Sequence, residues 1–138
     1  MMPYVLGGLL TTAVANMKQN DVMTEVLRRY EILRNYLKQT GEFPELHRES
    51  TIIGMNDISK DGVGYNIGKG YEIYICLNGD INSVMHVFLH ELAHNTVSEY
   101  DHSSKFWKNC TRLKEIAKQL GIYETTPVQP FCNGIIGD

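Results

Sequence analysis

The sequence predicts a single α+β domain over residues 1–138. It consists of a backing helix, a small, twisted and mostly antiparallel sheet, a helix that carries an HExxH pattern, and a closing helix. Three observations predict this fold class. Apolar residues recur with helical spacing near both ends, β-branched and aromatic residues between glycines occupy the middle, and no repeat or linker divides the chain. A chain of this length buries about two-thirds of its surface on folding, which is enough for one core.

The composition is that of an ordinary globular protein. Its 43% hydrophobic and 21% charged residues exclude disordered, collagen-like and coiled-coil chains. No stretch reaches the roughly 18 apolar residues that a bilayer span needs, which excludes a membrane-spanning protein. The net charge of −3 gives no overall attraction for nucleic acid or anionic membrane. Contact with nucleic acid would therefore have to be a local patch.

Residues 1–20 are expected to form an apolar N-terminal segment, a helix or strap packed on the domain. The order of small residues at positions 13–15 resembles the cleavage site of a secretory signal. No Lys or Arg precedes the apolar run, however, and Gly7-Gly8 interrupts it. Secretion is therefore not expected.

The cysteines point to an intracellular protein. The chain has an odd number of cysteines, namely Cys76, Cys110 and Cys132. Their spacing fits neither a disulfide framework nor a CxxC metal site. We therefore expect a reducing compartment, the cytoplasm or nucleus. No activating residue lies near Cys132 in the sequence, so we expect an inert thiol there.

The backing helix is predicted over residues 21–38. Asp21 can cap its start and Gly41 can close its end. Its charged residues are expected to lie in solvent. The apolar stripe recurs at steps of three and four residues. It comprises Val22, Val26, Tyr30, Leu33 and Leu37.

Residues 50–77 are predicted to form several short antiparallel strands, because glycines interrupt β-branched and aromatic residues. The clearest strand covers residues 71–77, and an exposed edge of this strand could align an extended peptide. The glycines around Lys69 fit a hairpin turn, because the spacing of a Walker phosphate loop is absent.

Two further helices complete the fold. The first is expected to begin near Asn82 or Ser83 and to end near Val97. The second is expected to begin at Ser103 or Ser104 and to stop at Gly121. Prolines then favour an irregular tail over residues 127–138.

The chemistry is carried by the HExxH pattern at residues 90–94, within the first of these helices. Four helical residues advance the chain by about 400°, so His90 and His94 lie one turn apart on one face and can converge on a metal ion. Glu91 lies beside the metal, where its carboxylate can take a proton from water and pass it to a leaving amine. Because this pattern arises by chance in about one of a hundred chains of this composition, its helical context matters.

A third ligand is needed, because catalytic zinc usually has three protein ligands and a fourth position for water. His102 is the leading candidate, since it follows His94 where the helix has ended. A chain that turns back brings this side chain under the metal, whereas a continuous helix would carry it about 12 Å away. The alternative for His102 is a role in capping or packing a turn. The rival ligands are Glu99, Asp101 and Glu115.

Three other features have a structural interpretation that is preferred over a functional one. His86 shares the helix face of the HExxH histidines and is interpreted as a bystander or core residue. Phe106 and Trp107 are interpreted as core aromatics rather than a stacking platform for nucleic acid. The basic side chains of the last helix fit a solvated face, and a weak nucleic-acid interface is the alternative. They are Lys105, Lys108, Arg112, Lys114 and Lys118.

Residues 90–95 (HELAHN) and 101–107 (DHSSKFW) resemble the WLM zinc metallopeptidase family, whose pattern is HELxHN, a later histidine, and a Phe-Trp pair that opens a helix. The wider resemblance covers about residues 21–136. It is closest to small WLM-like proteins of large DNA viruses and to the related SprT-like proteases. It implies a zincin-like metallopeptidase fold. It also implies Zn²⁺ on His90, His94 and His102, with Glu91 as general base and acid.

The chain departs from this family pattern at one position. In the better-known WLM proteases the third histidine follows the second by six residues, a position that Tyr100 occupies here. The longer spacing is compatible with the small viral relatives. The partner-binding and DNA-binding extensions of the DNA–protein crosslink proteases have no counterpart in these residues, so their biological role does not follow from the motif.

The expected function is zinc-dependent hydrolysis of a protein or peptide substrate, inside an infected cell or in a virion. Two alternatives of other classes remain open. One is a catalytically inactive zinc-binding module, which Glu91→Gln would leave unaffected. The other is a DNA-associated protein, for which salt-dependent DNA binding would be lost on reversing the charges of Lys108, Arg112 and Lys114.

Overall fold

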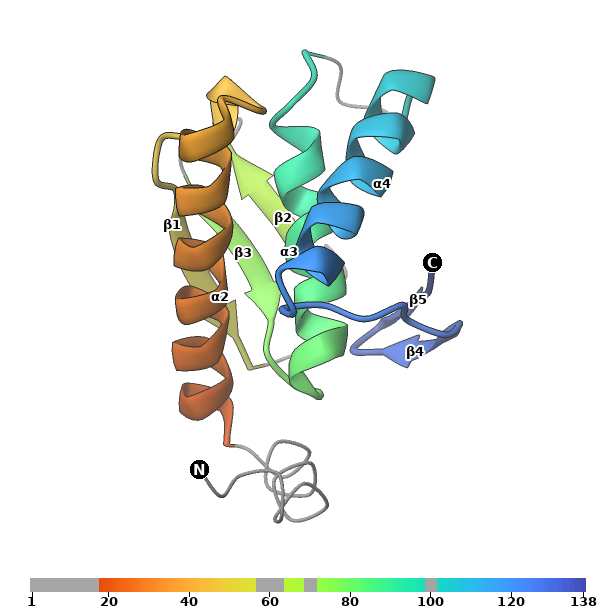
Figure 1. The fold of residues 1–138 in the computed structure, drawn as a ribbon. Helices are drawn as coiled ribbons and strands as arrows, with labels where there is room; N and C mark the ends of the chain where they lie inside the picture. The colour runs from red at the N-terminus through yellow and green to blue at the C-terminus, as the bar shows by residue number, and fades with distance from the viewer. Residues whose placement is uncertain (1–17, 57–63, 69–71, 99–101) are drawn as a thin grey trace.

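Three helices and two small sheets make up the described part of the chain, with α3 in the middle (Figure 1). The computed structural model describes residues 18–56, 64–68, 72–98 and 102–138. Helix α3 packs on the sheet and contacts both α2 and α4. The elements are α2 (Gln19–Thr40), η2 (Pro44–Leu46), β1 (Thr51–Met55), β2 (Gly64–Ile67), β3 (Glu72–Cys76), α3 (Ile81–His94), α4 (Ser104–Gln119), β4 (Gln129–Phe131) and β5 (Gly134–Ile136).

Much of the expected N-terminal segment, residues 1–17, lies outside the described residues, as does the turn at 69–71. Within the described ranges, no helix has the length and apolar character needed to cross a membrane.

The three-stranded sheet is mixed, which corrects the prediction of a mostly antiparallel one. Its order is β1-β3-β2. Strand β3 runs parallel to β1, with Thr51 opposite Glu72, and antiparallel to β2, with Ile67 opposite Glu72. Because β3 is central, its edges are not available to a peptide, and that expectation is wrong as well. Glycines mark where strands end, but they do not specify which strands become neighbours.

Helix α2 confirms the predicted stripe and its C-terminal stop. All five predicted positions are buried. Gly41 adopts φ 79° and donates its N–H to the Leu37 carbonyl oxygen at 2.9 Å, a conformation that costs glycine little. The predicted cap was wrong: Lys18 is the N-cap, without a side-chain hydrogen bond, and Asp21 lies in the first turn.

Helix α3 begins at Ile81, one or two residues before the start that the sequence predicted. Asp80 is its N-cap, and this carboxylate accepts hydrogen bonds from the backbone N–H of Ser83 at 3.2 Å and from its hydroxyl at 2.6 Å. The Asp80 side chain thus accepts from both hydrogen-bond donors of Ser83. Helix α3 ends at His94, before Val97, and Asn95 is its C-cap.

Both ends of α4 follow the prediction closely. The Ser103 side chain accepts the Phe106 N–H at 3.2 Å and caps the start. The C-cap is Leu120, and Gly121 follows it at φ 75°. The Ile122 N–H then bonds to the Ala117 carbonyl at 3.0 Å, which is the bond of a Schellman motif.

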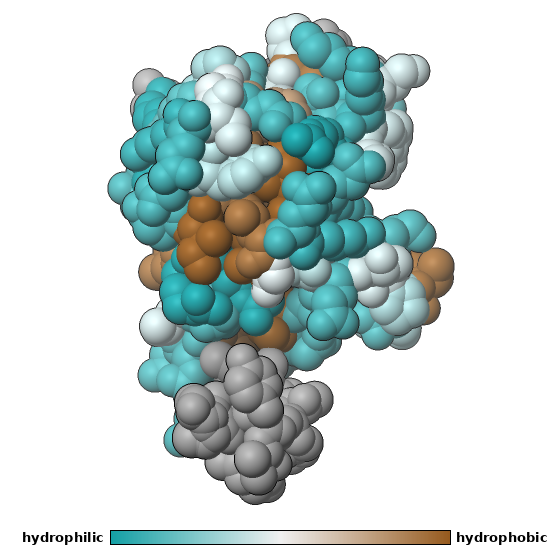
Figure 2. Space-filling model, in the orientation of Figure 1, coloured by the Kyte–Doolittle hydropathy of each residue, from teal (hydrophilic) through white to brown (hydrophobic). Residues whose placement is uncertain are grey.

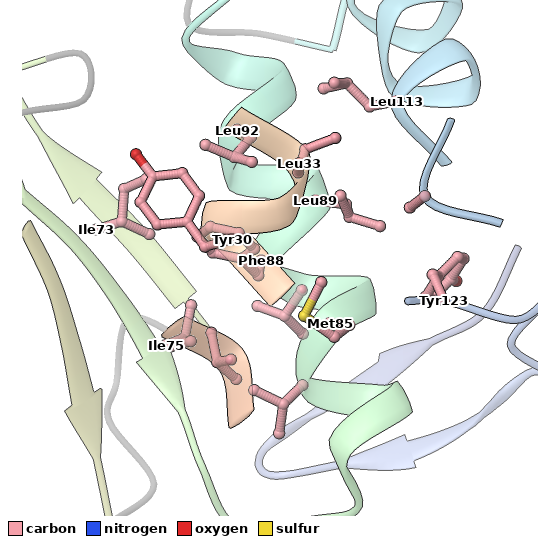
Figure 3. Close-up of a cluster of buried hydrophobic side chains, with 14 of the residues drawn as sticks. Tyr30, Leu33, Ile73, Ile75, Met85, Phe88, Leu89, Leu92, Leu113 and Tyr123 are labelled. Carbon is pink, nitrogen blue, oxygen red and sulfur yellow. The ribbon is translucent and has the colours of Figure 1, made fainter. Parts of the chain in front are cut away.

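The core lies between α2, the sheet, α3 and α4 (Figure 3). The Tyr30 ring meets the Phe88 ring edge to face, with 5.0 Å between centroids. The Tyr30 hydroxyl accepts the backbone N–H of Ser50 at 2.8 Å. Arg34 was expected in solvent but is only 8% exposed, because its guanidinium donates to the His47 carbonyl at 2.9 Å and lies over the Tyr30 ring, 5.8 Å from the centroid.

The C-terminal segment is a hairpin rather than an irregular tail. Strands β4 and β5 pair antiparallel, with Gln129 opposite Ile136. Phe131 packs so closely on Gly79 that a side chain at that glycine would overlap its ring. Both strands have only three residues, and β4 contains a proline, so they carry little alternating pattern and the sequence did not reveal them.

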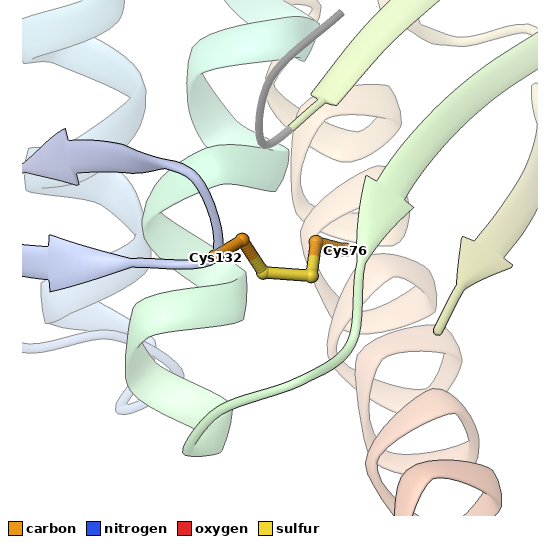
Figure 4. Close-up of a disulfide and its surroundings, with 2 residues drawn as sticks. All are labelled: Cys76 and Cys132. Atoms are coloured by element: carbon orange, nitrogen blue, oxygen red, sulfur yellow. A yellow bond between two sulfur atoms is a disulfide. The ribbon is translucent and has the colours of Figure 1, made fainter. Parts of the chain in front are cut away.

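A disulfide joins Cys132, in the turn of this hairpin, to Cys76 at the end of β3 (Figure 4). The prediction of an inert thiol at Cys132 is therefore wrong, and the argument for a reducing compartment loses its basis. Cys110 is free and buried. The two bonded residues are 56 positions apart, and only the fold brings them together.

Reduction of this disulfide is expected to lower the free energy of unfolding by about 4 kcal/mol, because the crosslink closes a loop of 56 residues in the unfolded chain. Urea unfolding with and without a phosphine reductant measures the difference. The variant Cys110→Ala serves as the background in both arms, since it removes the third thiol. An unchanged midpoint would contradict the expectation.

Apolar side chains reach the surface at several places. Figure 2 shows one apolar area in the hollow between α2 and α4, bordered by hydrophilic side chains, and another at the hairpin. The hairpin area includes Val128, which is 77% exposed, and Ile135, which is 71% exposed.

Candidate metal centre

Three imidazoles meet between α3 and the segment that precedes α4. His90 and His94 come from the C-terminal half of α3, and His102 comes from the residues just before the α4 cap. The Nε2 atom of His102 lies 3.2 Å from Nε2 of His90 and 3.1 Å from Nε2 of His94. The chain therefore turns back after α3, as the sequence argument required, and brings the three predicted side chains together.

This donor set fits zinc. Ligand nitrogens about 2.0–2.1 Å from a tetrahedral ion are about 3.3 Å apart. The Nε2 separations of 3.1–3.2 Å are close to that spacing. A single proton can bridge only one pair of facing nitrogens, whereas a cation can satisfy all three lone pairs. Three nitrogen ligands also leave one tetrahedral position open.

Two aromatic side chains hold the imidazoles in place. The Phe106 ring is fully buried and lies 4.4 Å, centroid to centroid, from His94 and 4.7 Å from His102. Trp107 lies 5.2 Å from the His102 ring but is 48% exposed. The core prediction is confirmed for Phe106 and wrong for Trp107. Periodicity could not distinguish them, because adjacent residues differ by about 100° around a helix.

A polar brace, which the sequence analysis missed, ties α4 to the end of α3. The Asn109 amide donates to the Thr96 hydroxyl at 2.9 Å, and that hydroxyl donates to the Ala93 carbonyl at 2.7 Å. Thr96 is 6% exposed and follows the helix cap, where helical periodicity no longer gives a signal. The brace fixes the helix end that carries His94 relative to the segment that carries His102.

Burial keeps His90 neutral. Desolvation, followed by the neighbouring His94 and His102, lowers the pKa of His90 from 6.5 to about 3. Because a neutral imidazole is the form that binds metals, this ring has an available lone pair across the physiological pH range.

Glu91 is 6% exposed and follows His90 directly on α3, outside the three-histidine cluster. Of the rival third ligands, Glu115 is outside the cluster too. Its carboxylate faces Arg112 at 3.7 Å, and 58% of its side chain is exposed. The other two rivals, Glu99 and Asp101, lie outside the described residues.

His86 belongs to a separate buried cluster, which confirms its interpretation as a core residue. Its Nδ1 lies 3.0 Å from the Tyr123 hydroxyl and 3.3 Å from the Asp138 carboxylate. The Tyr123 hydroxyl donates to Asp138 at 3.0 Å, and Lys114 pairs with the same carboxylate at 2.6 Å. Burial, followed by the charge of Lys114, lowers the pKa of His86 despite the opposing effect of Asp138.

Acid is expected to destabilise the protein through His86. Below the unfolded-state pKa of 6.5, the unfolded chain binds a proton that the folded chain does not, so stability falls as the pH falls. His86→Gln is expected to remove up to about 1.4 kcal/mol per pH unit of this dependence. Urea unfolding between pH 7.5 and 5 measures it, with His47→Gln as the control. The expectation is contradicted if the free energy of unfolding changes equally with pH in the two variants.

The basic face of α4 is partly neutralised within the molecule. Arg112 makes two hydrogen bonds to the Glu42 carboxylate, at 2.7 and 3.0 Å, and Lys114 pairs with Asp138. Two of the three residues on which the DNA hypothesis relied are thus engaged in ion pairs. This arrangement weakens the case for a nucleic-acid interface.

Known proteins are similar to this chain in sequence or in fold. The WLM domain model matches residues 47–129. The uncharacterized protein R325 of Acanthamoeba polyphaga mimivirus is 30% identical over 151 residues, covering 91% of this chain and 76% of that protein. The crystal structure of Wss1 from Saccharomyces cerevisiae matches with a TM-score of 0.56 and 17% identity, over 75% of this chain and 84% of that one. The metallopeptidase zymogen abylysin of Pyrococcus abyssi gives a TM-score of 0.44 at 20% identity, over 68% of this chain and 97% of that one.

The likeness to Wss1 confirms the predicted α+β fold. The family model covers more than half of the chain, and the mimivirus relative is aligned over most of its length. The chain therefore belongs to the WLM domain family.

Proposed function

We propose that this protein is a zinc-dependent peptidase, with Zn²⁺ held by His90, His94 and His102 and with Glu91 as general base and acid. The observation that carries the proposal is the approach of the Nε2 atoms of His90 and His94 to within 3.1–3.2 Å of the His102 Nε2 atom, beside a buried glutamate. Membership of the WLM family supports it. The substrate is a protein or peptide.

Each group in this site has a definable task. A zinc ion supplies Lewis acidity, which polarises a peptide carbonyl and lowers the pKa of water. The Glu91 carboxylate takes a proton from the attacking water and delivers it to the leaving amine. Phe106 and the Asn109–Thr96 brace keep the imidazoles in position, so little reorganisation accompanies the reaction.

Strand β2 is proposed to align the substrate. It contacts α3, the helix of the metal centre, and among the described strands it pairs only with β3. An extended peptide can add to such an edge through backbone hydrogen bonds. This assigns to β2 the role that the sequence analysis had given to β3.

Zinc titration combined with a cleavage assay tests the proposal. The full chain is expected to bind one zinc ion, to unfold at a higher temperature when loaded, and to cleave unfolded casein only in the loaded form. Free zinc at 100 times its dissociation constant should add about 2.7 kcal/mol to stability. Zinc binding without cleavage of casein would favour the inactive zinc-binding module, and failure to bind zinc would refute the proposal.

A further inference from the structure

A groove of about 730 Å³ runs between α4 and the segment that follows α2. Its volume is within the range of about 300–1,000 Å³ that is typical of ligand clefts. Trp107, Thr111 and Glu115 lie four residues apart and form one wall along α4. Glu42 and Phe43, which follow α2, form the other wall. The groove is thus built from two elements that are far apart in the sequence.

The groove and the candidate metal centre share Trp107. This side chain lines the groove, and its ring lies 5.2 Å from the His102 ring and 6.0 Å from the His90 ring. It is 48% exposed, whereas the adjacent Phe106 is fully buried. A chain extended from the metal centre over Trp107 would therefore enter the groove.

The charges that line the groove balance one another. Two acids and two bases contribute to it. Arg112 is engaged by Glu42 at 2.7 Å and faces Glu115 at 3.7 Å, which leaves Lys108 as the remaining base. An arrangement of this kind gives no strong field for an acidic or a basic ligand. Two aromatic residues, Phe43 and Trp107, provide apolar surface instead.

We infer that this groove is a substrate subsite that takes a bulky apolar side chain of the peptide, on one side of the bond to be cleaved. The inference rests on the proposed peptidase function for its meaning, but binding in the groove can be measured without cleavage. Trp107 is then the residue that connects peptide recognition to the metal centre.

Trp107 also provides the measurement, because it is the single tryptophan of the chain. Its fluorescence is followed in the zinc-loaded Glu91→Gln protein, which should bind peptides without cleaving them. The probes are three blocked pentapeptides of glycine and serine whose central residue is phenylalanine, alanine or glutamate. We expect the phenylalanine peptide to bind at least tenfold more tightly than the other two.

Two variants of α4 locate the binding. Thr111→Arg places a large side chain in the groove from an exposed position, and should weaken binding of the phenylalanine peptide at least tenfold. Gln119→Arg makes the same substitution at an exposed position of the same helix outside the groove lining, and should leave binding unchanged.

Equal binding of the three peptides, or undiminished binding by Thr111→Arg, would overturn the inference. So would a fluorescence change caused by a single-stranded oligonucleotide and not by the peptides. These outcomes are distinct from failure of the proposed function. Selective peptide binding with no cleavage by the unsubstituted protein would refute the peptidase and leave the apolar subsite standing, whereas cleavage without selective binding would do the reverse.

Discussion

Glu91→Gln is expected to lower kcat/KM for peptide hydrolysis by about a thousandfold while the protein still binds one zinc ion. General acid–base catalysis typically contributes about 10²–10⁴ to an enzymatic rate. Glutamine has nearly the same shape as glutamate but cannot take a proton from water. Because residue 91 is buried at 6% exposure, its replacement must preserve shape for the comparison to report on chemistry rather than packing.

Kinetics and zinc content measured on the same preparations test this prediction. Glu49→Gln is the matched control, because it makes the same substitution at an exposed position outside both the three-histidine cluster and the groove lining. It should retain both activity and metal. Full activity in Glu91→Gln would exclude this carboxylate as the base. Loss of zinc from Glu91→Gln would instead give the residue a structural role at the site.

Local patterns in the sequence predicted the helices well. The stripe from Val22 to Leu37 is buried, Gly41 ends α2, and Ser103 caps α4. Each of these features depends on residues within a turn or two of helix. The N-cap of α3 was missed because Asp80 and Ser83 are both good capping residues, and only the geometry shows that the carboxylate of the first holds the second.

Features that depend on contacts distant in the sequence were not predicted. The parallel pairing of β1 with β3 follows from the position of β2 beyond β3. The bond between Cys76 and Cys132 requires the hairpin to fold back against the end of β3. No local propensity encodes either arrangement, because both are set by how the elements pack.

In the candidate site, too, the sequence predicted the local features and missed most of those that depend on packing. His90 and His94 could be paired from helical geometry alone, since four residues separate them. The approach of His102 depends on how α4 docks on α3, and the resemblance to a family with a later histidine supported that choice. The exposed position of Trp107 and the brace between Asn109 and Thr96 had no signal in the sequence.

His102→Ala is expected to weaken zinc binding by more than 100-fold. Loss of groups that only orient metal ligands typically costs about 10–100-fold in affinity, so loss of a ligand should cost more. His90 and His94 would remain on α3, but two ligands are fewer than the three that catalytic zinc usually takes. Competition titration with a chromophoric zinc chelator measures the affinity.

Unfolding experiments separate this loss of metal from damage to the fold. Because His102 is exposed, the metal-free variant should unfold at nearly the same urea concentration as the metal-free parent. Added zinc should then stabilise the parent and hardly affect the variant, since stabilisation by a ligand depends on its affinity for the folded state. His47→Ala removes a histidine outside the cluster and should respond to zinc as the parent does. Equal stabilisation of His102→Ala by zinc would show that residue 102 is not a ligand, and would leave His90 and His94 to bind the metal with a donor other than the one proposed.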